Sequence, residues 1–406
     1  MSRSPQGNPK ERDFSLVNIG QLVTNNSSLG TGELGVIENA AITVVAGKVT
    51  WVGASSAVDS SLPKVDAQGR SVLPGFVDSH SHIIFGGDRS QEFAARMAGV
   101  PYSAGGIKVT MAATRASSSE DLKANAQSLI TEMYEAGTTT VEIKSGYGLD
   151  VETEKRSVQV AAQLTDEVTY LGAHVVAPEF ANDPDAYVDL VTGEMLNACA
   201  EYSKWIDVFC DRGAFTGQQT KKILEAGISK GLLPRVHLNQ LEQGDHIQMA
   251  VDLDCASADH LTYLTDQDIQ TLARSQTVAG LVPACDFSTR APHYPRGRDL
   301  LDAGVSVSLS PDCNPGSSYT TNMPFSIALA VREMHLTVDE TIYAATMGGA
   351  KALRRNDVGH LSVGANADLV LLTAKNYIHL AYRPGVPLVQ KVWKNGTLMF
   401  TKGDQG

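Results

Sequence analysis

The sequence predicts an α/β protein, a (β/α)8 TIM-like barrel with a small β-sandwich domain formed from both chain termini. Three observations support this fold class. Strand-like apolar runs alternate with helix-like segments from about residue 74 to residue 358, eight such strands follow one another, and the chain ends carry shorter apolar runs of another pattern. A chain of 406 residues, 43% hydrophobic and 19% charged, has the size and core-forming content of a barrel with an accessory domain.

The two chain ends predict one composite β domain, made of residues 1–73 and 359–406. Short apolar runs broken by Gly and Asn predict antiparallel strands joined by tight turns, as at residues 16–19, 34–37 and 42–45. The same pattern returns near the C-terminus, at residues 367–372 and 391–396. Because chain ends often lie close together, we expect both ends to build one domain beside the barrel of residues 74–358.

The central segment contains eight strand candidates separated by helix-like stretches. They lie at residues 77–80, 140–143, 169–172, 206–209, 234–237, 255–259, 278–282 and 305–309. One helix is expected to begin at Ser119 and to close at Gly137, and Thr265 is expected to cap another. A long helix is expected from Asp185 to Tyr202. An open doubly wound sheet is the alternative, but no G-x-G-x-x-G motif follows an early strand.

Residues with metal-binding chemistry stand at the ends of these strands. In a barrel, catalytic residues gather at the carboxyl ends of the parallel strands. Five of the ten histidines fall there, and the eighth strand leads to an aspartate; the set is His80, His82, His174, His237, His260 and Asp312. His80 and His82 project to the same side, because strand residues two apart share a face. Each histidine alone is more typical of packing or polar surface, but the set predicts a metal site.

We therefore expect His80, His82, His237 and Asp312 to bind one Zn or Fe ion with a position left open for water. A bound cation lowers the pKa of that water to about 7, which supplies a nucleophile at neutral pH. His260 is then spare for catalytic proton transfer, and Asp312 is expected to share in orienting the nucleophile.

Composition narrows the partners and the compartment. The net charge of −12 disfavours nucleic acid and anionic membranes as general partners, although a single local Arg can still bind an anionic small molecule. The five cysteines are odd in number and form no C-x-x-C pair, so free thiols in a reducing compartment are expected. Without an apolar segment at its start or of membrane-spanning length, the chain is expected to be cytoplasmic.

The pattern of His-x-His after strand 1, His after strands 5 and 6 and Asp after strand 8 resembles the amidohydrolase superfamily. Within it the chain is similar to the imidazolonepropionases, on the strings at residues 73–82, 85–89, 142–149 and 310–317. That resemblance implies hydrolysis of 4-imidazolone-5-propanoate to N-formimidoyl-L-glutamate in L-histidine degradation, and a homodimer. Some superfamily barrels hold two metals bridged by a carboxylated Lys on strand 4. Lys144 lies on strand 2 by our count, so we expect one ion per subunit; a count wrong by two would restore a binuclear site.

The resemblance also implies a set of substrate-binding residues: Arg89, Tyr102, Tyr147, His174, Gln240, Asn314, Gly316 and Ser317. Arg89 matches the position that binds the substrate carboxylate, for which a guanidinium is well suited. As bare sequence, Arg89 would be a surface residue and residues 314–317 a turn. Gln240 stands where relatives often carry Glu, and an amide cannot act as a general base. Proton transfer would then fall to His260 and Asp312, with Gln240 left to bind the ring.

Two other functions stay open at this point. A deaminase of the same superfamily acting on a nucleobase would share the metal ligands, but it would generally rely on the Glu that is replaced by Gln240 and would have less need of Arg89. A non-catalytic scaffold on the same fold would have lost metal ligands, whereas all four are present here. Ammonia release from nucleobases would reveal the deaminase, and a purified protein without metal would favour the scaffold.

Overall fold

The barrel strands follow one another as predicted. The computed structural model describes residues 13–58, 61–99 and 106–403. Its eight barrel positions are β6 (Phe76–Asp78), β7 (Thr138–Val141) with β8 (Ile143–Lys144), β9 (Val168–Ala173), β10 (Trp205–Cys210), β11 (Leu233–Pro234) with β12 (Val236–Leu238), β13 (Ser257–His260), β14 (Val278–Leu281) and β15 (Val307–Leu309). Each coincides with a strand expected from the sequence.

These strands pair in parallel and close into a ring. β6 pairs with β7, and the ladder continues from β8 through β9, β10, β12, β13 and β14 to β15. Just past the last strand, Ser81 and Cys313 form a parallel bridge, and the backbone N–H of His82 donates to the carbonyl of Cys313 at 2.9 Å. The chain therefore returns from β15 to β6, which confirms the barrel and excludes the open doubly wound sheet.

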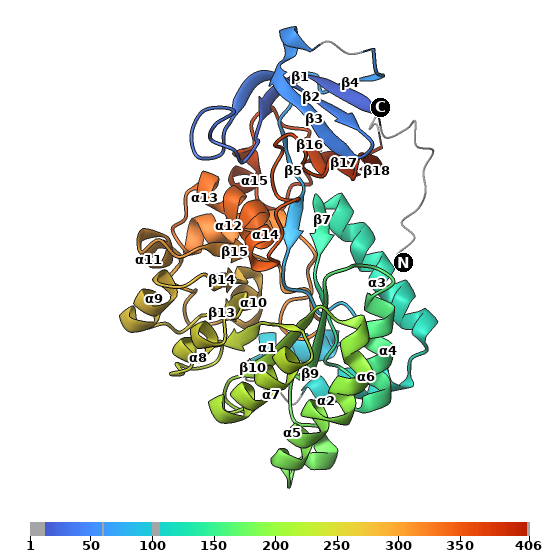
Figure 1. Ribbon diagram of the computed structural model, residues 1–406, viewed down its shortest axis with the longest axis vertical. Coiled ribbons are helices and arrows are strands. Elements are labelled where there is room, and N and C mark those ends of the chain that lie inside the picture. The colour runs from blue at the N-terminus through green and yellow to red at the C-terminus, as the bar shows by residue number, and fades with distance from the viewer. Residues whose placement is uncertain (1–12, 59–60, 100–105, 404–406) are drawn as a thin grey trace.

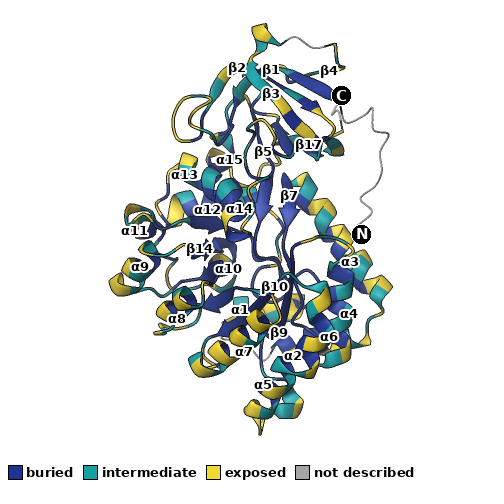
Figure 2. Cartoon of the chain, in the orientation of Figure 1, coloured by how far each residue is buried: buried dark blue, intermediate teal, exposed yellow. Residues whose placement is uncertain are grey.

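The helices surround the barrel, with their inner faces buried and their outer faces exposed (Figures 1 and 2). They are α1 (Ser90–Met97), α2 (Ile107–Ala116), α3 (Ser119–Glu135), α4 (Val151–Ala161), α5 (Pro184–Thr192), α6 (Glu194–Cys199), α7 (Gly217–Ser229), α8 (Ile247–Asp252), α9 (Asp266–Ala273), α10 (Pro283–Thr289), α11 (Gly297–Asp302), α12 (Met323–Glu333), α13 (Val338–Tyr343), α14 (Gly349–Ala352) and α15 (His379–Tyr382). Within the described ranges, no helix has both the length and the apolar character that crossing a membrane requires.

Local capping chemistry explains where the predicted helices begin and end. Ser118 and Asp121 form a reciprocal capping box at the start of α3, and Gly137, with φ +95°, follows its end. Thr265 caps α9 in the same way, as expected. The single helix predicted from Asp185 to Tyr202 is wrong: α5 and α6 separate at Gly193, whose φ of −107° and ψ of −105° lie outside the helical region. Glycine adopts that conformation at little steric cost.

Both chain ends contribute to one further sheet, which lies beside the barrel in Figure 1. Its strands are β1 (Phe14–Leu22), β2 (Ile37–Val45), β3 (Lys48–Ala54), β4 (Lys64–Asp66), β5 (Val72–Pro74), β16 (Leu369–Leu372), β17 (Val389–Lys394) and β18 (Thr397–Thr401), in the order β18-β17-β16-β5-β1-β2-β3 with β4 beside β1. The expectation of purely antiparallel pairing is wrong for β4 and β5, which both run parallel to β1. β2 occupies one edge of β1, so the later strands reach its other edge by a crossover.

This sheet folds over on itself around its own core. Phe14 on β1 and Trp393 on β17 stack with ring centroids 5.6 Å apart, although two strands lie between them in the sheet. The N–H of Ala367 also donates to the carbonyl of Gly47 at 2.9 Å, which joins the β2–β3 hairpin to the segment before β16. The core of this sandwich is separate from the barrel core. The domain limits 1–73 with 359–406, and 74–358, remain our proposal.

Candidate active site

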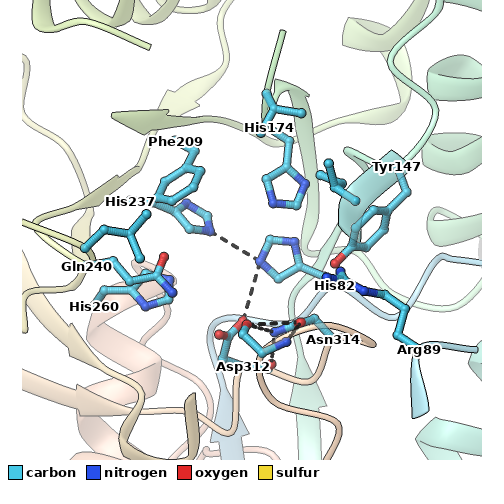
Figure 3. Close-up of a pocket in the computed structure, with 14 residues that line it drawn as sticks. His82, Arg89, Tyr147, His174, Phe209, His237, Gln240, His260, Asp312 and Asn314 are labelled. Atoms are coloured by element: carbon cyan, nitrogen blue, oxygen red, sulfur yellow. Dashed lines mark hydrogen bonds and ion pairs between the residues drawn. The ribbon is translucent and has the colours of Figure 1, made fainter. Parts of the chain in front are cut away.

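Three histidines and one aspartate predicted as metal ligands come together at the carboxyl end of the barrel. His80 and His82 follow β6, and His237 lies within β12. The Nε2 atoms of His80 and His82 are 3.3 Å apart, as are those of His82 and His237. Asp312, which follows β15, places Oδ1 3.6 Å from the Nε2 atoms of both His80 and His82. All four side chains are buried, and Figure 3 shows His82 between His237 and Asp312.

Buried carboxylates behind the histidines fix their tautomers. His80 Nδ1 donates to Asp259 Oδ2 at 2.9 Å, and His237 Nδ1 donates to Asp207 Oδ1 at 3.0 Å. Since a carboxylate only accepts, the proton of each neutral ring is on Nδ1 and the lone pair is on Nε2. Burial lowers the pKa of His80 and of His82 well below the usual range, so both rings are neutral at pH 7.

The donor set fits a bound cation. Nε2 of His82 lies 3.3 Å from Nε2 of both His80 and His237, and a single N–H could satisfy only one of these contacts. The other pair would bring two nitrogen lone pairs together in a dry site, which is repulsive. A cation removes that repulsion, and imidazole with carboxylate is a ligand set typical of Zn or Fe. The ligand role of the four residues remains a prediction that this geometry supports.

Lys144 lies on β8, the second strand position, as counted from the sequence. Its Nζ is 3.0 Å from Glu142 Oε1 and 2.8 Å from Asp207 Oδ2, and all three side chains are fully buried. Burial opposes the charge, but Asp207 and Glu142 raise the pKa of Lys144 above its usual value. Lys144 is therefore an ammonium, whereas a carboxylated Lys would carry negative charge beside two carboxylates. This arrangement supports the prediction of one ion.

Sequence reasoning missed the supporting carboxylates Asp207 and Asp259. Both lie inside buried strands, where an ionised side chain requires a partner. Asp207 accepts from His237 and from Lys144. These two groups together hold the pKa of the Asp207 carboxyl well below the usual range, although burial raises it. Asp259 accepts from His80 and also pairs with Arg235, whose Nη2 is 3.3 Å from Asp259 Oδ2. An acidic residue in the middle of an apolar strand was the available signal.

His260 ends β13 and faces the same cluster. Its ring centroid lies 5.2 Å from that of His237 and 5.4 Å from that of His80. Burial lowers the pKa of His260 to about 3, so the ring is neutral and has a lone pair to accept a proton. His260 and Asp312 both adopt positive φ, +77° and +56°. Such left-handed backbone at non-glycine residues is costly and tends to occur at functional sites.

One cavity contains most of the remaining predicted residues. It is lined by His82, Arg89, Ile107, Tyr147, His174, Val175, Phe209, His237, Gln240, Leu241, His260, Asp312, Asn314 and Ser317. Arg89 lies on one side of His82 and Asp312, whereas Gln240 and His260 lie on the other (Figure 3). Tyr102, the other predicted binding residue, falls outside the described residues. The cavity thus joins a cationic end to the histidine cluster.

Arg89 is a buried cavity residue, not the solvated surface residue that the bare sequence favoured. Only 8% of it is exposed. Glu92 accepts from its Nε at 2.9 Å and from its Nη2 at 2.6 Å, so one edge of the guanidinium is clamped. On another side, a Cβ added to Gly316 would lie 2.1 Å from Nη1. Gly316 therefore leaves the room that the guanidinium occupies.

The loop after Asp312 is held by its own side chains. Asn314 Oδ1 accepts from the backbone N–H of Gly316 at 2.9 Å and of Ser317 at 2.7 Å. The amide nitrogen of Asn314 donates to the carbonyl of Asp312 at 2.8 Å. The predicted binding loop is therefore an ordered turn fastened to a proposed ligand, beside Arg89.

Tyr147 and His174 form the aromatic wall of the cavity. His174 Nδ1 donates to the carbonyl of Gly146 at 2.9 Å, which leaves the lone pair on Nε2. Burial lowers the pKa of His174 to about 3, so it remains neutral. Its ring stacks on His82 with centroids 5.2 Å apart, and Tyr147 packs edge-on against it at the same separation. The predicted Tyr147 and His174 are thus brought against a proposed metal ligand.

Gln240 is fixed by two contacts. Its backbone N–H donates to Asp211 Oδ2 at 2.7 Å, and its amide nitrogen donates to Cys285 Sγ at 3.4 Å. The sequence predicts that Cys285 is one of five free thiols, and all five are free and buried. The available sequence signal was the position of Cys285 just past the end of β14, in the first turn of α10.

Comparison with known proteins defines the class. A family model described as "Amidohydrolase family" matches residues 71–401. Solved structures that share the fold include 5-methylcytosine deaminase from Klebsiella pneumoniae, with a TM-score of 0.74 at 16% identity over 96% of this chain and 98% of that one. Guanine deaminase from C. acetobutylicum gives 0.69 at 15% identity, over 96% and 100%. The chain belongs to the amidohydrolase family, whose members are metal-dependent hydrolases.

The more similar relatives define its place within that family. The chain is 61% identical over 383 residues to imidazolonepropionase of Mycolicibacterium smegmatis, covering 94% of this chain and 96% of that protein. It is 57% identical over 383 residues to imidazolonepropionase of Streptomyces griseus, covering 94% and 98%. By these matches it is a member of the imidazolonepropionase family.

Proposed function

We propose that this chain hydrolyses 4-imidazolone-5-propanoate to N-formimidoyl-L-glutamate in L-histidine degradation. Water cleaves the ring amide: the bond between the carbonyl carbon and the adjacent ring nitrogen breaks, the carbon becomes a carboxylate, and the nitrogen takes up a proton. The observation that carries this proposal is the 61% identity over 383 residues to an imidazolonepropionase. A cavity that joins a buried arginine to the histidine cluster fits an anionic, cyclic substrate.

Substrate orientation follows from the two ends of the cavity. Arg89, clamped by Glu92 and backed by Gly316, is assigned to the propanoate carboxylate. Tyr147 and His174 are assigned to one side of the imidazolone ring, and Gln240 to the other. Asn314 and Ser317 are assigned to the carboxylate end of the product. In this assigned orientation the ring carbonyl would lie next to His82 and Asp312.

The catalytic residues divide the proton transfers. An ion held by His80, His82, His237 and Asp312 would supply a water of lowered pKa and polarise the carbonyl. Neutral His260 is assigned as acceptor of the water proton and as its donor to the ring nitrogen when the C–N bond opens. Asp312 orients the attacking oxygen. Gln240 lacks a titratable group, so its amide binds the ring and moves no proton.

The finer composition of the holoenzyme is part of the proposal. One ion per chain, Zn or Fe, agrees with the position of Lys144 away from the fourth strand. The binding partner is a small molecule, and the assembly is a homodimer in solution. Light scattering of the purified protein, coupled to size-exclusion chromatography, tests the dimer: a mass of one chain would contradict it.

The reaction is tested with freshly generated 4-imidazolone-5-propanoate. We expect loss of the imidazolone absorbance with equimolar formation of N-formimidoyl-L-glutamate, identified by mass spectrometry. Guanine and 5-methylcytosine serve as controls for the deaminase alternative, and no ammonia release is expected from either. Turnover of a nucleobase without turnover of the imidazolone would overturn the proposal.

A further inference from the structure

Cys285 is a thiol inside the active site with no role in the reaction proposed above. It lies in the first turn of α10 and is only 2% exposed. Its Sγ accepts from the amide of Gln240, and with His260 and Asp312 it forms a group whose ligand atoms all lie within 4.8 Å of one another. Among the described residues, groups of three such side chains occur at two places, and both are in this site.

The three ligand atoms are close enough to hold one ion. Zn²⁺ binds sulfur at about 2.3 Å and nitrogen or oxygen at about 2.0–2.2 Å, so tetrahedral ligand atoms lie roughly 3.4–3.8 Å apart. The three ligand atoms already lie within 4.8 Å of one another, which exceeds that separation by about 1.4 Å at most. A thiol, an imidazole and a carboxylate thus converge on one place, and each of these groups can bind a metal ion. All three side chains are buried, which leaves few competing waters.

We propose that Cys285, His260 and Asp312 form a second, inhibitory site for a thiophilic divalent cation such as Cd²⁺ or excess Zn²⁺. Binding replaces the S–H proton, which leaves to solvent, by a metal–sulfur bond. A soft thiolate selects these ions over Mg²⁺ and Ca²⁺. This ion is additional to the resident one held by His80, His82, His237 and Asp312, a set that has no sulfur ligand and shares Asp312 with the second site.

Inhibition follows from the shared residues. An ion in this site occupies the nitrogen with which His260 would move protons, and it competes for the carboxylate of Asp312. It also lies against Gln240, which the thiol contacts. The inhibition rests on the proposed function, whereas binding of the ion does not, so the two can be measured separately.

The experiment uses protein whose resident site is already loaded with one equivalent of Cd²⁺. Further Cd²⁺ is added while the ultraviolet thiolate-to-cadmium charge-transfer band and the bound metal per chain are measured, the latter by equilibrium dialysis. We expect a band that saturates as a second ion binds, with loss of imidazolone hydrolysis over the same concentrations. Cys285→Ala should lose the band and retain one ion per chain.

Cys199→Ala is the matched control, because Cys199 is equally buried but lies in the helical core on α6. It should keep the band and the second ion. A Cys285→Ala protein that still binds a second Cd²⁺, or a wild-type protein that binds none, would overturn the proposal. These binding readouts decide the matter even if the protein fails to turn over the imidazolone, which would instead count against the proposed function.

Discussion

At the scale of single residues, the site works by combining neutral imidazoles with ionised partners placed behind them. Asp259 and Asp207 hold protons on the outer nitrogens of His80 and His237, so the inner nitrogens face each other as lone pairs. Burial keeps His260 neutral as well. The consequence is a group of bases suited to bind a cation, with one further imidazole for the proton transfer that we propose.

The role of His260 can be separated from that of the ligands. His260→Ala is expected to lower turnover about 10²- to 10⁴-fold, the range typical of a lost general acid–base group. The metal content should stay at one ion per chain, because His260 belongs to no part of the three-histidine set. Steady-state kinetics and elemental analysis of the same sample check this. Wild-type turnover in the variant would remove His260 from the mechanism.

Arg89 is predicted to act on binding of the propanoate tail. Arg89→Lys should raise KM about 10- to 100-fold, since a single ammonium replaces a bidentate fork, and should change kcat less. Gly316→Ala should raise KM in the same way without removing the charge, because its Cβ would lie 2.1 Å from Arg89 Nη1. Kinetics with an imidazolone lacking the carboxylate are the control. If Arg89→Lys raises KM for that analogue as much as for the substrate, Arg89 does not bind the tail.

At the scale of elements, each strand end supplies one or two functional groups and each following loop holds them. β6, β12, β13 and β15 lead into the histidines and Asp312, and the Asn314 turn fastens the last of them. The helix α10 adds Cys285, whose Sγ contacts the amide of Gln240. Strand ends and the turns after them position the site together. We therefore expect a substitution in these elements to change stability and activity by different amounts.

Asp286 in α10 provides a pH-dependent test of stability. Burial raises the pKa of Asp286 from 3.8 to about 7, although Thr262 donates to its Oδ1 at 2.8 Å. Between those pH values the folded protein binds the extra proton, so this aspartate costs stability progressively as pH rises from about 4 to 7. The free energy of unfolding of Asp286→Asn should therefore rise relative to that of wild type across that window, by up to about 4 kcal/mol. Above the window the difference between the two proteins should stay constant. Urea unfolding at several pH values measures the difference; parallel curves would contradict it.

The elements were largely predictable, and the failures have local causes. Eight strands and the caps at Ser118 and Thr265 follow from apolar runs and capping residues that are close in sequence. The break at Gly193 was missed because the apolar pattern continues across it while the backbone does not. The parallel pairing of β4 with β1 depends on which sheet edge is open, which no local pattern records.

In the site, as in the fold, features with a sequence signal were predictable and contacts that depend on the folded chain were not. That the four proposed metal ligands come together was predictable, because strand ends in a barrel meet at one rim and sequence order therefore gives proximity. Asp207, Asp259 and Cys285 were not identified, since their partners lie 30, 179 and 45 residues away in the chain. The contacts of Arg89 with Glu92 and Gly316 likewise require the folded loop.

At the scale of the whole molecule, the protein has two separate hydrophobic cores, one in the barrel and one in the sandwich. The barrel core supports the site, and the sandwich built from both chain ends closes through the stacking of Phe14 on Trp393. The chain passes directly from β5 in the sandwich to β6 in the barrel, so the first ligand-bearing strand is anchored at its start by the second domain.

Trp393→Ala should therefore destabilise the protein without changing substrate recognition. Loss of a buried Trp typically costs about 3–5 kcal/mol, and only 4% of Trp393 is exposed. The unfolding midpoint in urea should fall while KM stays at the wild-type value. Trp393→Phe, which keeps an aromatic ring against Phe14, should recover part of the loss. A raised KM in folded Trp393→Ala protein would show that the sandwich shapes the site.

The central claim is that one ion held by His80, His82, His237 and Asp312 supports hydrolysis of the imidazolone. The most direct measurement is turnover of 4-imidazolone-5-propanoate during stepwise addition of Zn²⁺ or Fe²⁺ to chelator-treated protein. Activity should start near zero, rise in proportion to the metal bound and reach its maximum at one ion per chain, before excess Zn²⁺ inhibits, and His237→Ala should show no such rise. Full activity without metal, or a rise that continues to two ions per chain, would contradict the claim.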